Sequence, residues 1–332
     1  MTEVYDDNGD ITSYIVNYKS SGFIIIAADN RINPILAFSD SGTFPLDEDF
    51  YPAGLTEWMS EIKELVYNVR SQNIEQVAEI ALAWQPYVIQ KVVSGGGGSD
   101  KAAPTRWFDP NSADQGCESI YEVVGPLLQT QWHQGAGFND LLPYLGCPKT
   151  GNGRVATGCV ATAMAQIMKF HRFPNTYDWD SMLNFSGSYE AARLMGSAGI
   201  AVDMDYDCVS SANTKDVPYA LIHKFGYASA QYADYDLGTI RQQLRWNQPV
   251  ILRGGESGFL GIYKDGHAWV CDGFKYQLIY NPECNVATAS TYLYMNWGWW
   301  RGEHNAWYSD NWVNANGSFN YKRGMVYNIR KP

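Results

Sequence analysis

Apolar, β-rich runs separated by polar turn residues near the N-terminus predict β-strands. Residues 12–42 contain two β-rich runs, YIVNY and GFIIIAAD, separated by the turn-like sequence KSSG, which indicates an antiparallel meander. Further on, apolar residues recur at the spacing of one helix face: Leu55, Trp58, Met59, Ile62, Leu65 and Val66. We therefore expect a small α+β unit, with strands followed by one or two helices.

A glycine-rich segment follows this unit. Residues 94–104 read SGGGGSDKAAP, and a run of glycines cannot pack into a core, so the segment is typical of a flexible, exposed connection. This predicts a domain boundary near residues 95–105, with one unit at 1–100 and a second at 101–332.

The second unit is predicted to be a helical part followed by an antiparallel sheet, and is therefore also α+β. Its helical signal is the alanine-rich run ATAMAQIM. Short β-rich runs separated by Gly and Asn turns come later: QPVILRGG, HAWVCDGF, LIYN, TYLYMNWGWW and GMVYNIR. We expect TYLYMNWGWW to pair with HAWVCDGF as an antiparallel neighbour.

Composition narrows the possible partners. The chain has 24 Lys and Arg against 35 Asp and Glu, and its net charge of -11 disfavours nucleic acid and anionic membrane surfaces. We find no apolar run long enough to span a membrane. The start, MTEVYDDNGD, lacks a basic and then apolar signal segment. Either the protein is cytoplasmic or a signal has been removed, and a Met joined directly to a strand favours the second.

The six cysteines are widely spaced and form no CxxC pair. This spacing disfavours a structural zinc site and a disulfide scaffold, so we expect most of them to be small buried residues. Cys159 differs because it lies within the first turn of the helix predicted from near Thr157. There the free N–H groups and the helix dipole stabilise a thiolate. The alternative is an inert cysteine buried beside alanines.

A reactive thiolate needs a base, a group that orients the base, and donors for an oxyanion. Of the five histidines, only His267, in KDGHAWVCDGF, opens a predicted strand. On the neighbouring strand, Asn296 can bond to one imidazole nitrogen while Trp297 and Trp299 exclude water. In QWHQGAG, Gln134 can donate to an oxyanion. The alternatives are an edge histidine, core tryptophans and an ordinary surface glutamine.

Several of these segments together resemble the streptopain family (peptidase family C10) of papain-like cysteine peptidases, which are secreted bacterial zymogens. The segments are LLQTQWHQGAGFN, ATGCVATAMAQIMKFHRFP, GHAWVCDGF and NWGWW, in the family's order. The N-terminal GFIIIAADNRINPILAFSDSGTF resembles the family's inhibitory prodomain. The resemblance implies a papain-like peptidase domain preceded by a small α+β prodomain that acts as an intramolecular inhibitor.

By this resemblance, Cys159 is the nucleophile, His267 is its partner, and Gln134 is an oxyanion donor. Papain-like enzymes commonly carry Asn-Ser-Trp-Gly. Here Trp297 and Gly298 follow Asn296 directly, so the spacing from Asn to Trp-Gly is one residue shorter. Either Asn296 or Trp297 is therefore expected to orient or cover the histidine. Residues 300–301, WR, also depart from a pattern that tends towards glycines.

The implied activity is that of a cysteine-type endopeptidase acting on proteins or peptides through a thioester, with no metal or organic cofactor. We expect secretion from a bacterium or residence in its cell envelope. Cleavage is expected near residues 100–120, where Lys101 and Arg106 lie in an exposed segment. Two alternatives stay open: a papain-fold acyltransferase, and an inactive scaffold used for binding. The second would be marked by loss of Cys159, His267 or Gln134, and all three are present.

Overall fold

The structure is a computed structural model of the 332-residue chain, and it describes residues 1–46, 51, 53–87, 117–257, 263–299, 302, 304–310 and 323–332. The predicted boundary near 95–105 lies outside the described residues, as do Lys101 and Arg106.

The N-terminal unit is a four-stranded antiparallel meander followed by helices, as the β-rich runs and the helical spacing of apolar residues predicted. Its strands are β1 (Thr2–Tyr5), β2 (Ile11–Asn17), β3 (Phe23–Ala27) and β4 (Ile35–Ser39). They are followed by α1 (Ala53–Ser71), α2 (Ala78–Trp84) and the short 3-10 helix η1 (Gln85–Tyr87). The helix face predicted for α1 is buried along most of its length.

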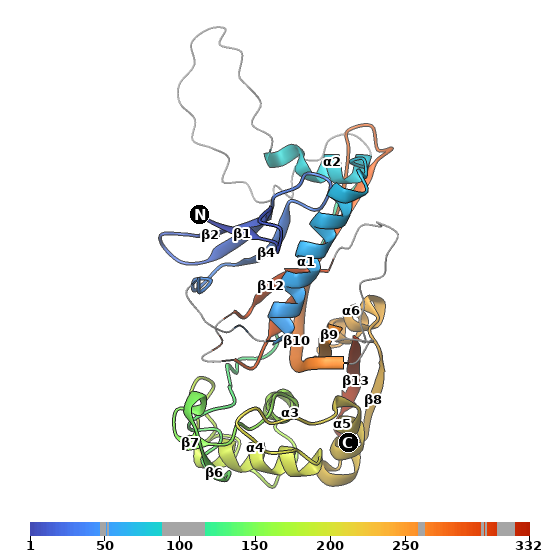
Figure 1. The fold of residues 1–332 in the computed structure, drawn as a ribbon. Helices are drawn as coiled ribbons and strands as arrows, with labels where there is room; N and C mark the ends of the chain where they lie inside the picture. The colour runs from blue at the N-terminus through green and yellow to red at the C-terminus, as the bar shows by residue number, and fades with distance from the viewer. Residues whose placement is uncertain are drawn as a thin grey trace.

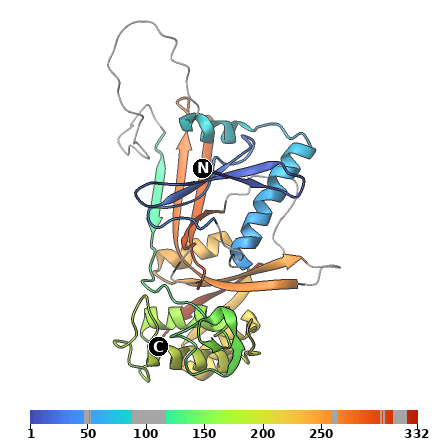
Figure 2. The same cartoon turned by 60° about the vertical axis from the view of Figure 1, so that its left-hand side comes forward.

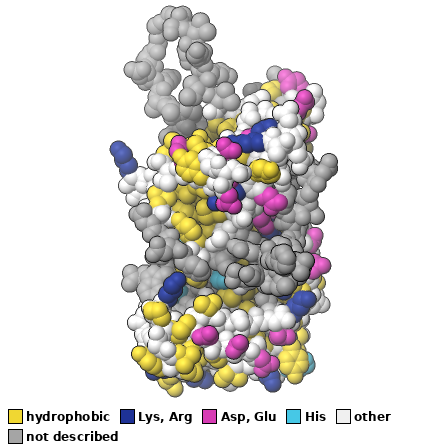
Figure 3. All heavy atoms as spheres, viewed as in Figure 1, with side chains coloured by type: hydrophobic (Ala, Val, Ile, Leu, Met, Phe, Trp, Pro, Cys, Tyr) yellow, Lys and Arg dark blue, Asp and Glu magenta, His cyan; other side chains and the backbone are white. Residues whose placement is uncertain are grey.

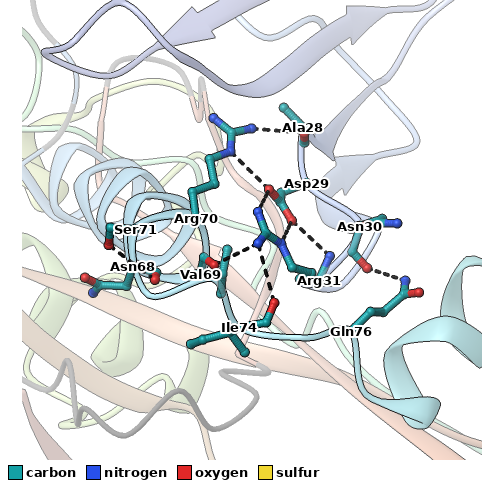
Figure 4. A network of polar contacts seen from close by, with 10 residues as sticks. All are labelled: Ala28, Asp29, Asn30, Arg31, Asn68, Val69, Arg70, Ser71, Ile74 and Gln76. Carbon is teal, nitrogen blue, oxygen red and sulfur yellow. Dashed lines mark hydrogen bonds and ion pairs between the residues drawn. The ribbon is translucent and has the colours of Figure 1, made fainter.

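Asp29 ties the meander to α1 (Figure 4). Its carboxylate accepts hydrogen bonds from Nε and Nη2 of Arg31, both at 2.7 Å, and from Nε of Arg70 at 3.0 Å. Arg31 also donates to the carbonyl of Val69 at 2.9 Å, and Arg70 to that of Ala28 at 3.2 Å. The turn between β3 and β4 is thereby fixed to the C-terminal end of α1.

The helical part of the second unit surrounds α3 (Cys159–His171). The other elements are β6 (Tyr144–Cys147), η2 (Pro148–Thr150), β7 (Gly153–Arg154), α4 (Tyr189–Ala201), η3 (Thr214–Asp216), α5 (Val217–Tyr219) and the π-helical turn η4 (Ala220–Lys224). The apolar face of α3 packs against α4 on one side and against the sheet on the other, with Val160, Met164 and Ile167 buried.

The sheet part is antiparallel, as predicted, and all of it except β5 follows α3 and α4 in the chain. Its elements are β5 (Ile120–Val124), β8 (Ser229–Asp234), α6 (Leu237–Arg245), β9 (Val250–Ser257), β10 (Tyr263–Tyr280), β11 (Ala287–Asn296), β12 (Ala306–Ser309) and β13 (Gly324–Arg330). The two runs HAWVCDGF and LIYN form one long strand, β10. It pairs with β11 in the predicted way, with Val270 opposite Asn296.

One continuous sheet joins the two units. Strand β4 pairs with β12 through Phe38 opposite Trp307 and Ala37 opposite Tyr308, giving the order β1-β2-β3-β4-β12-β11-β10-β9-β13-β8. In Figures 1 and 2 the helical part, in green and yellow, lies on one side of β10, and the N-terminal strands and α1, in blue, lie on the other.

The two units also share one apolar cluster. Leu55 and Trp58 of α1 belong to the same buried cluster as Leu252 of β9, Trp269 of β10 and Met325 of β13. The surface is mixed in charge: Figure 3 shows acidic and basic side chains interspersed over one face. Within the described ranges, no helix combines the length and hydrophobicity that crossing a membrane requires.

Four of the six cysteines form disulfides, which corrects the prediction that most are simply small buried residues. Cys117 pairs with Cys284 and Cys147 with Cys208, whereas Cys159 and Cys271 are free. The partners lie 167 and 61 residues apart in the chain. Spacing along the chain gave no sign of pairing because the fold brings these cysteines together from distant segments.

Candidate active site

Cys159 is the first residue of α3, two residues after the predicted start of the helix near Thr157. The preceding Gly158 has a φ of 85°, and a Cβ at that position would overlap the side chain of Met204. Only glycine adopts this backbone conformation easily, so the chain enters the helix through a sharp turn. The partly exposed thiol therefore lies among the free N–H groups of the first turn.

His267 lies on β10 beside Cys159. The strand begins four residues before His267, at Tyr263, so the prediction that this histidine opens the strand is wrong. The next backbone N–H, of Ala268, donates to Sγ of Cys159 at 3.4 Å. The imidazole Nε2 lies 2.8 Å from the carbonyl oxygen of Trp297. A carbonyl only accepts, so Nε2 carries the hydrogen and Nδ1 is left for the sulfur.

The charge states of Cys159 and His267 are coupled. Burial raises the pKa of the thiol and lowers the pKa of the imidazole, but at each residue the charge and the hydrogen bond of the other act in the opposite direction. The N–H groups of Ala268 and Val160 also lower the pKa of Cys159, and the Trp297 carbonyl helps to raise that of His267. The net effect lowers the pKa of Cys159 and raises that of His267, which favours a thiolate and imidazolium pair.

The sequence left Asn296 and Trp297 open as the residue that orients His267, and the group that faces the imidazole Nε2 is the backbone carbonyl of Trp297. Asn296 is buried and points elsewhere: its Nδ2 donates to the carbonyl of Thr130 at 2.8 Å, and its amide also bonds to Gln166. The carbonyl that faces His267 belongs to the next residue, Trp297. A backbone oxygen has no signature in the sequence, so residue-type reasoning could not single it out.

The aromatic residues around His267 differ in part from those predicted. Trp299 packs edge-on against the imidazole, with ring centroids 6.3 Å apart. Trp269 lies nearly parallel to it at 6.1 Å and was missed, although its place two residues along the same strand puts it on the same face. The indole of Trp297 turns away and donates to the carbonyl of His304 at 3.0 Å.

Gln134 lies near the start of α3 through its backbone. Its carbonyl accepts a hydrogen bond from the N–H of Thr157 at 3.1 Å, two residues before Cys159. The residue is half-buried. The fold thus brings the QWHQGAG segment to the end of the helix that carries Cys159. The role of the Gln134 side chain towards an oxyanion stays a prediction.

The N-terminal end of α1 lies against the aromatic residues next to His267. A Cβ on Gly54 would stand 2.5 Å from Cζ3 of Trp297 and 2.9 Å from Cζ3 of Trp269. One turn further, the ring of Trp58 packs edge-on against Tyr308 with centroids 5.0 Å apart. The first helix therefore covers the face of β10 that carries Trp269.

An ion pair joins the same helix to the second unit. Glu61 of α1 binds Arg323, which also lies 3.8 Å from a carboxylate oxygen of Asp310. The hydroxyl of Tyr235 donates to that oxygen at 2.5 Å. Burial raises the pKa of Glu61 to about 7 and that of Asp310 to about 6 in spite of Arg323.

Comparison with known families matches both units. Residues 132–176 and 175–308 match the peptidase C10 family, and residues 1–66 match the Spi protease inhibitor family. The match to the inhibitor family covers the meander and most of α1.

Individual relatives agree with these matches. Streptopain of Streptococcus pyogenes is 27% identical over 341 residues, covering 86% of this chain and 71% of streptopain. The thiol protease/hemagglutinin PrtT of Porphyromonas gingivalis is 24% identical, covering 85% of this chain and 32% of PrtT. A prointerpain A fragment of Prevotella intermedia has a similar fold, with a TM-score of 0.64, 23% identity and coverage of 99% of this chain and 98% of the fragment.

The family resemblance and the α+β papain-like fold predicted from the sequence are therefore confirmed. The chain is a cysteine peptidase that belongs to the peptidase C10 family, the family of streptopain, and it carries an N-terminal inhibitor-like prodomain.

Proposed function

We propose that this chain is the zymogen of a secreted bacterial endopeptidase that cleaves protein or peptide substrates through a thioester on Cys159. The observation that carries the proposal is the pairing of Cys159, at the start of α3, with His267, whose Nε2–H is held by the Trp297 carbonyl. This pairing supplies a nucleophile whose ionisation is favoured and an acid that is already oriented.

In the proposed mechanism, the Cys159 thiolate attacks the peptide carbonyl carbon. The negative charge that develops on the oxygen is stabilised by the N–H of Cys159 and by the side-chain amide of Gln134. His267 then gives its Nδ1 proton to the leaving amine, and a thioester forms. Water, deprotonated by the now neutral His267, attacks the thioester and releases the acid product and the thiolate. The chain's own residues supply every group in this cycle.

We assign residues 1–100 to the prodomain and 101–332 to the peptidase, with a cut near residues 100–120 in the region of Lys101 and Arg106. The disulfide between Cys117 and Cys284 places a constraint on the site. A cut before Cys117 leaves the new N-terminal segment attached to the β10–β11 hairpin and leaves β5 paired with β10. The two disulfides also support secretion, because such bonds persist in oxidising compartments.

The nucleophile can be tested with a thiol-directed epoxide inhibitor. We expect the matured protein to form one adduct at Cys159 and to lose peptidase activity, and Cys159→Ala to be inactive and unlabelled. Cys271→Ala is the matched control, since it removes the other free cysteine, and it should behave like the parent. Activity that survives in Cys159→Ala would overturn the proposal. Peptide transfer to an added amine, in place of hydrolysis, would identify a transferase.

The cut can be tested by incubating the intact chain and sequencing any new N-terminus. We expect one between residues 100 and 117. A stable 332-residue species with full activity would contradict the proposal that the chain is a zymogen.

A further inference from the structure

Three segments far apart in the sequence must be held in register for the proposed mechanism. They are α3 with Cys159, the segment from Thr130 to Gln134, and the turn after β11 that carries the Trp297 carbonyl. The same three segments meet around one fully buried side chain, that of Gln166.

The Gln166 amide bonds to both of the other segments. Its Oε1 accepts from the hydroxyl of Thr130 at 2.9 Å, from the N–H of Trp132 at 3.4 Å and from Nδ2 of Asn296 at 3.2 Å. Its Nε2 donates to Oδ1 of Asn296 at 3.2 Å. The Asn296 amide then donates to the Thr130 carbonyl at 2.8 Å and accepts from the N–H of Gly298 at 3.3 Å.

We propose that Gln166 is a positioning residue of the active site, which locks the three segments together through its amide; this inference rests on the proposed function. Gln166 follows Cys159 by seven residues, two turns along the same face of α3. Asn296 precedes Trp297 directly, and Thr130 precedes Gln134 by four residues. Each bond of the amide thus fixes a segment within a few residues of a group used in the mechanism.

An amide is needed at this position because the partners require both a donor and an acceptor. Asn296 presents its Oδ1 and its Nδ2 to Gln166 together, and only a group with both functions satisfies both atoms. All of these groups are buried: Gln166 is 0% exposed, Asn296 3% and Thr130 4%. An apolar side chain of equal length would leave the buried side chains of Asn296 and Thr130 without these partners.

The consequence reaches Cys159 through His267. The turn that Asn296 anchors carries the carbonyl that accepts from Nε2 of His267, and this bond helps to raise the pKa of the imidazole. If the turn shifts, the imidazolium loses stabilisation, and so does the thiolate paired with it. Loss of the Gln166 amide is therefore expected to raise the pH at which Cys159 ionises, an effect that a general loss of stability does not produce.

The test compares Gln166→Met with Gln243→Met. Gln243 is also buried on a helix, at 4% exposure, and its Oε1 accepts from the N–H of Asn328 at 3.0 Å, but it lies in α6, away from the three segments. The first measurement is the rate at which iodoacetamide alkylates Cys159 in the matured enzyme as a function of pH, with the site identified by mass spectrometry. The second is kcat and KM of the matured enzyme, together with the thermal midpoint.

For Gln166→Met we expect the inflection of the Cys159 profile to rise by about one pH unit, since one unit is tenfold in ionisation. At a pH below the inflection, kcat should fall about tenfold, with a much smaller change in KM. Gln243→Met should lower the thermal midpoint without moving either quantity. An unchanged inflection and kcat in Gln166→Met would overturn the inference.

If Gln166→Met does not accumulate as folded protein, Thr130→Val decides the question. This variant replaces the hydroxyl that donates to Gln166. The inflection of the Cys159 alkylation profile should then shift to higher pH, by less than in Gln166→Met. An alkylation profile identical to that of the parent would overturn the inference. Failure of the proposed function looks different, because the parent itself would then show no acidic Cys159 profile and no hydrolysis.

Discussion

Replacement of Trp58 by alanine should release the prodomain from the peptidase. Trp58 is 6% exposed, lies on α1, and packs against Tyr308 of β12 and within the apolar cluster that contains Trp269. Its indole N–H also donates to the carbonyl of Ser309 at 3.4 Å. Most of these contacts cross from the prodomain to the peptidase, so their loss weakens docking more than it weakens the prodomain itself.

The size of the effect follows from the burial of this side chain. Truncation of a buried tryptophan to alanine typically costs about 3–5 kcal/mol, and each 1.4 kcal/mol is a factor of ten. Because an undocked helix can partly cover Trp58 again, we take the lower end of this range. The undocked population of the full-length chain should then increase on the order of 100-fold.

The assay is the rate of Cys159 alkylation in the uncut chain under conditions where opening is fast compared with alkylation, so that the rate follows the open population. The matched control is Tyr67→Ala, which removes an aromatic ring that is 52% exposed on the same helix. Equal alkylation rates in Trp58→Ala and Tyr67→Ala would refute the reasoning that docking of α1 controls access to the active site.

Three further changes test single groups. The pKa of Glu61 is raised to about 7, so its contribution to docking is present below pH 4.5 and lost as the pH rises towards 7; the thermal midpoint of the full chain with Glu61→Gln should therefore rise relative to that of the parent over this range. The pKa of Asp272 is also raised by burial, to about 7. The thermal midpoint of Asp272→Asn should therefore rise relative to that of the parent over the same pH range, both in the full chain and in the matured enzyme. Arg31→Ala removes two bonds to the buried Asp29 and should lower the free energy of unfolding in urea by roughly 1–3 kcal/mol; a change below about 0.5 kcal/mol, the usual range of surface substitutions, would show that Arg70 suffices.

The features predicted correctly from the sequence share a local origin. The meander, α1 and the antiparallel pairing of β10 with β11 each follow from the spacing of apolar residues within one segment. The position of Cys159 in the first turn of a helix is likewise a local feature, whereas the polar residues expected to form a turn before His267 lie within β10. These local predictions hold in the folded chain because tertiary packing buries the same faces that the spacing of apolar residues predicts.

The features that were missed depend on contacts between distant segments. The disulfide partner of Cys117 lies 167 residues away, and the acceptor for His267 is a main-chain oxygen that any residue type would provide. Gln166 appears in the sequence as one polar residue in an alanine-rich helix, and its three bonded partners lie 34, 36 and 130 residues away. The missing information is thus the tertiary arrangement that brings these residues together.

Docking through a shared sheet and a shared core has a consequence for activation. A cut in the connection breaks one peptide bond, but it leaves intact the β4–β12 pairing, the ion pair between Glu61 and Arg323, and the apolar cluster around Trp58. Because none of these contacts depends on chain continuity, the cut by itself only converts an intramolecular inhibitor into a bound one, whose release then depends on its concentration. Activation therefore requires dilution of the cleaved prodomain or its further proteolysis, and weakening the contacts of α1 should hasten either route.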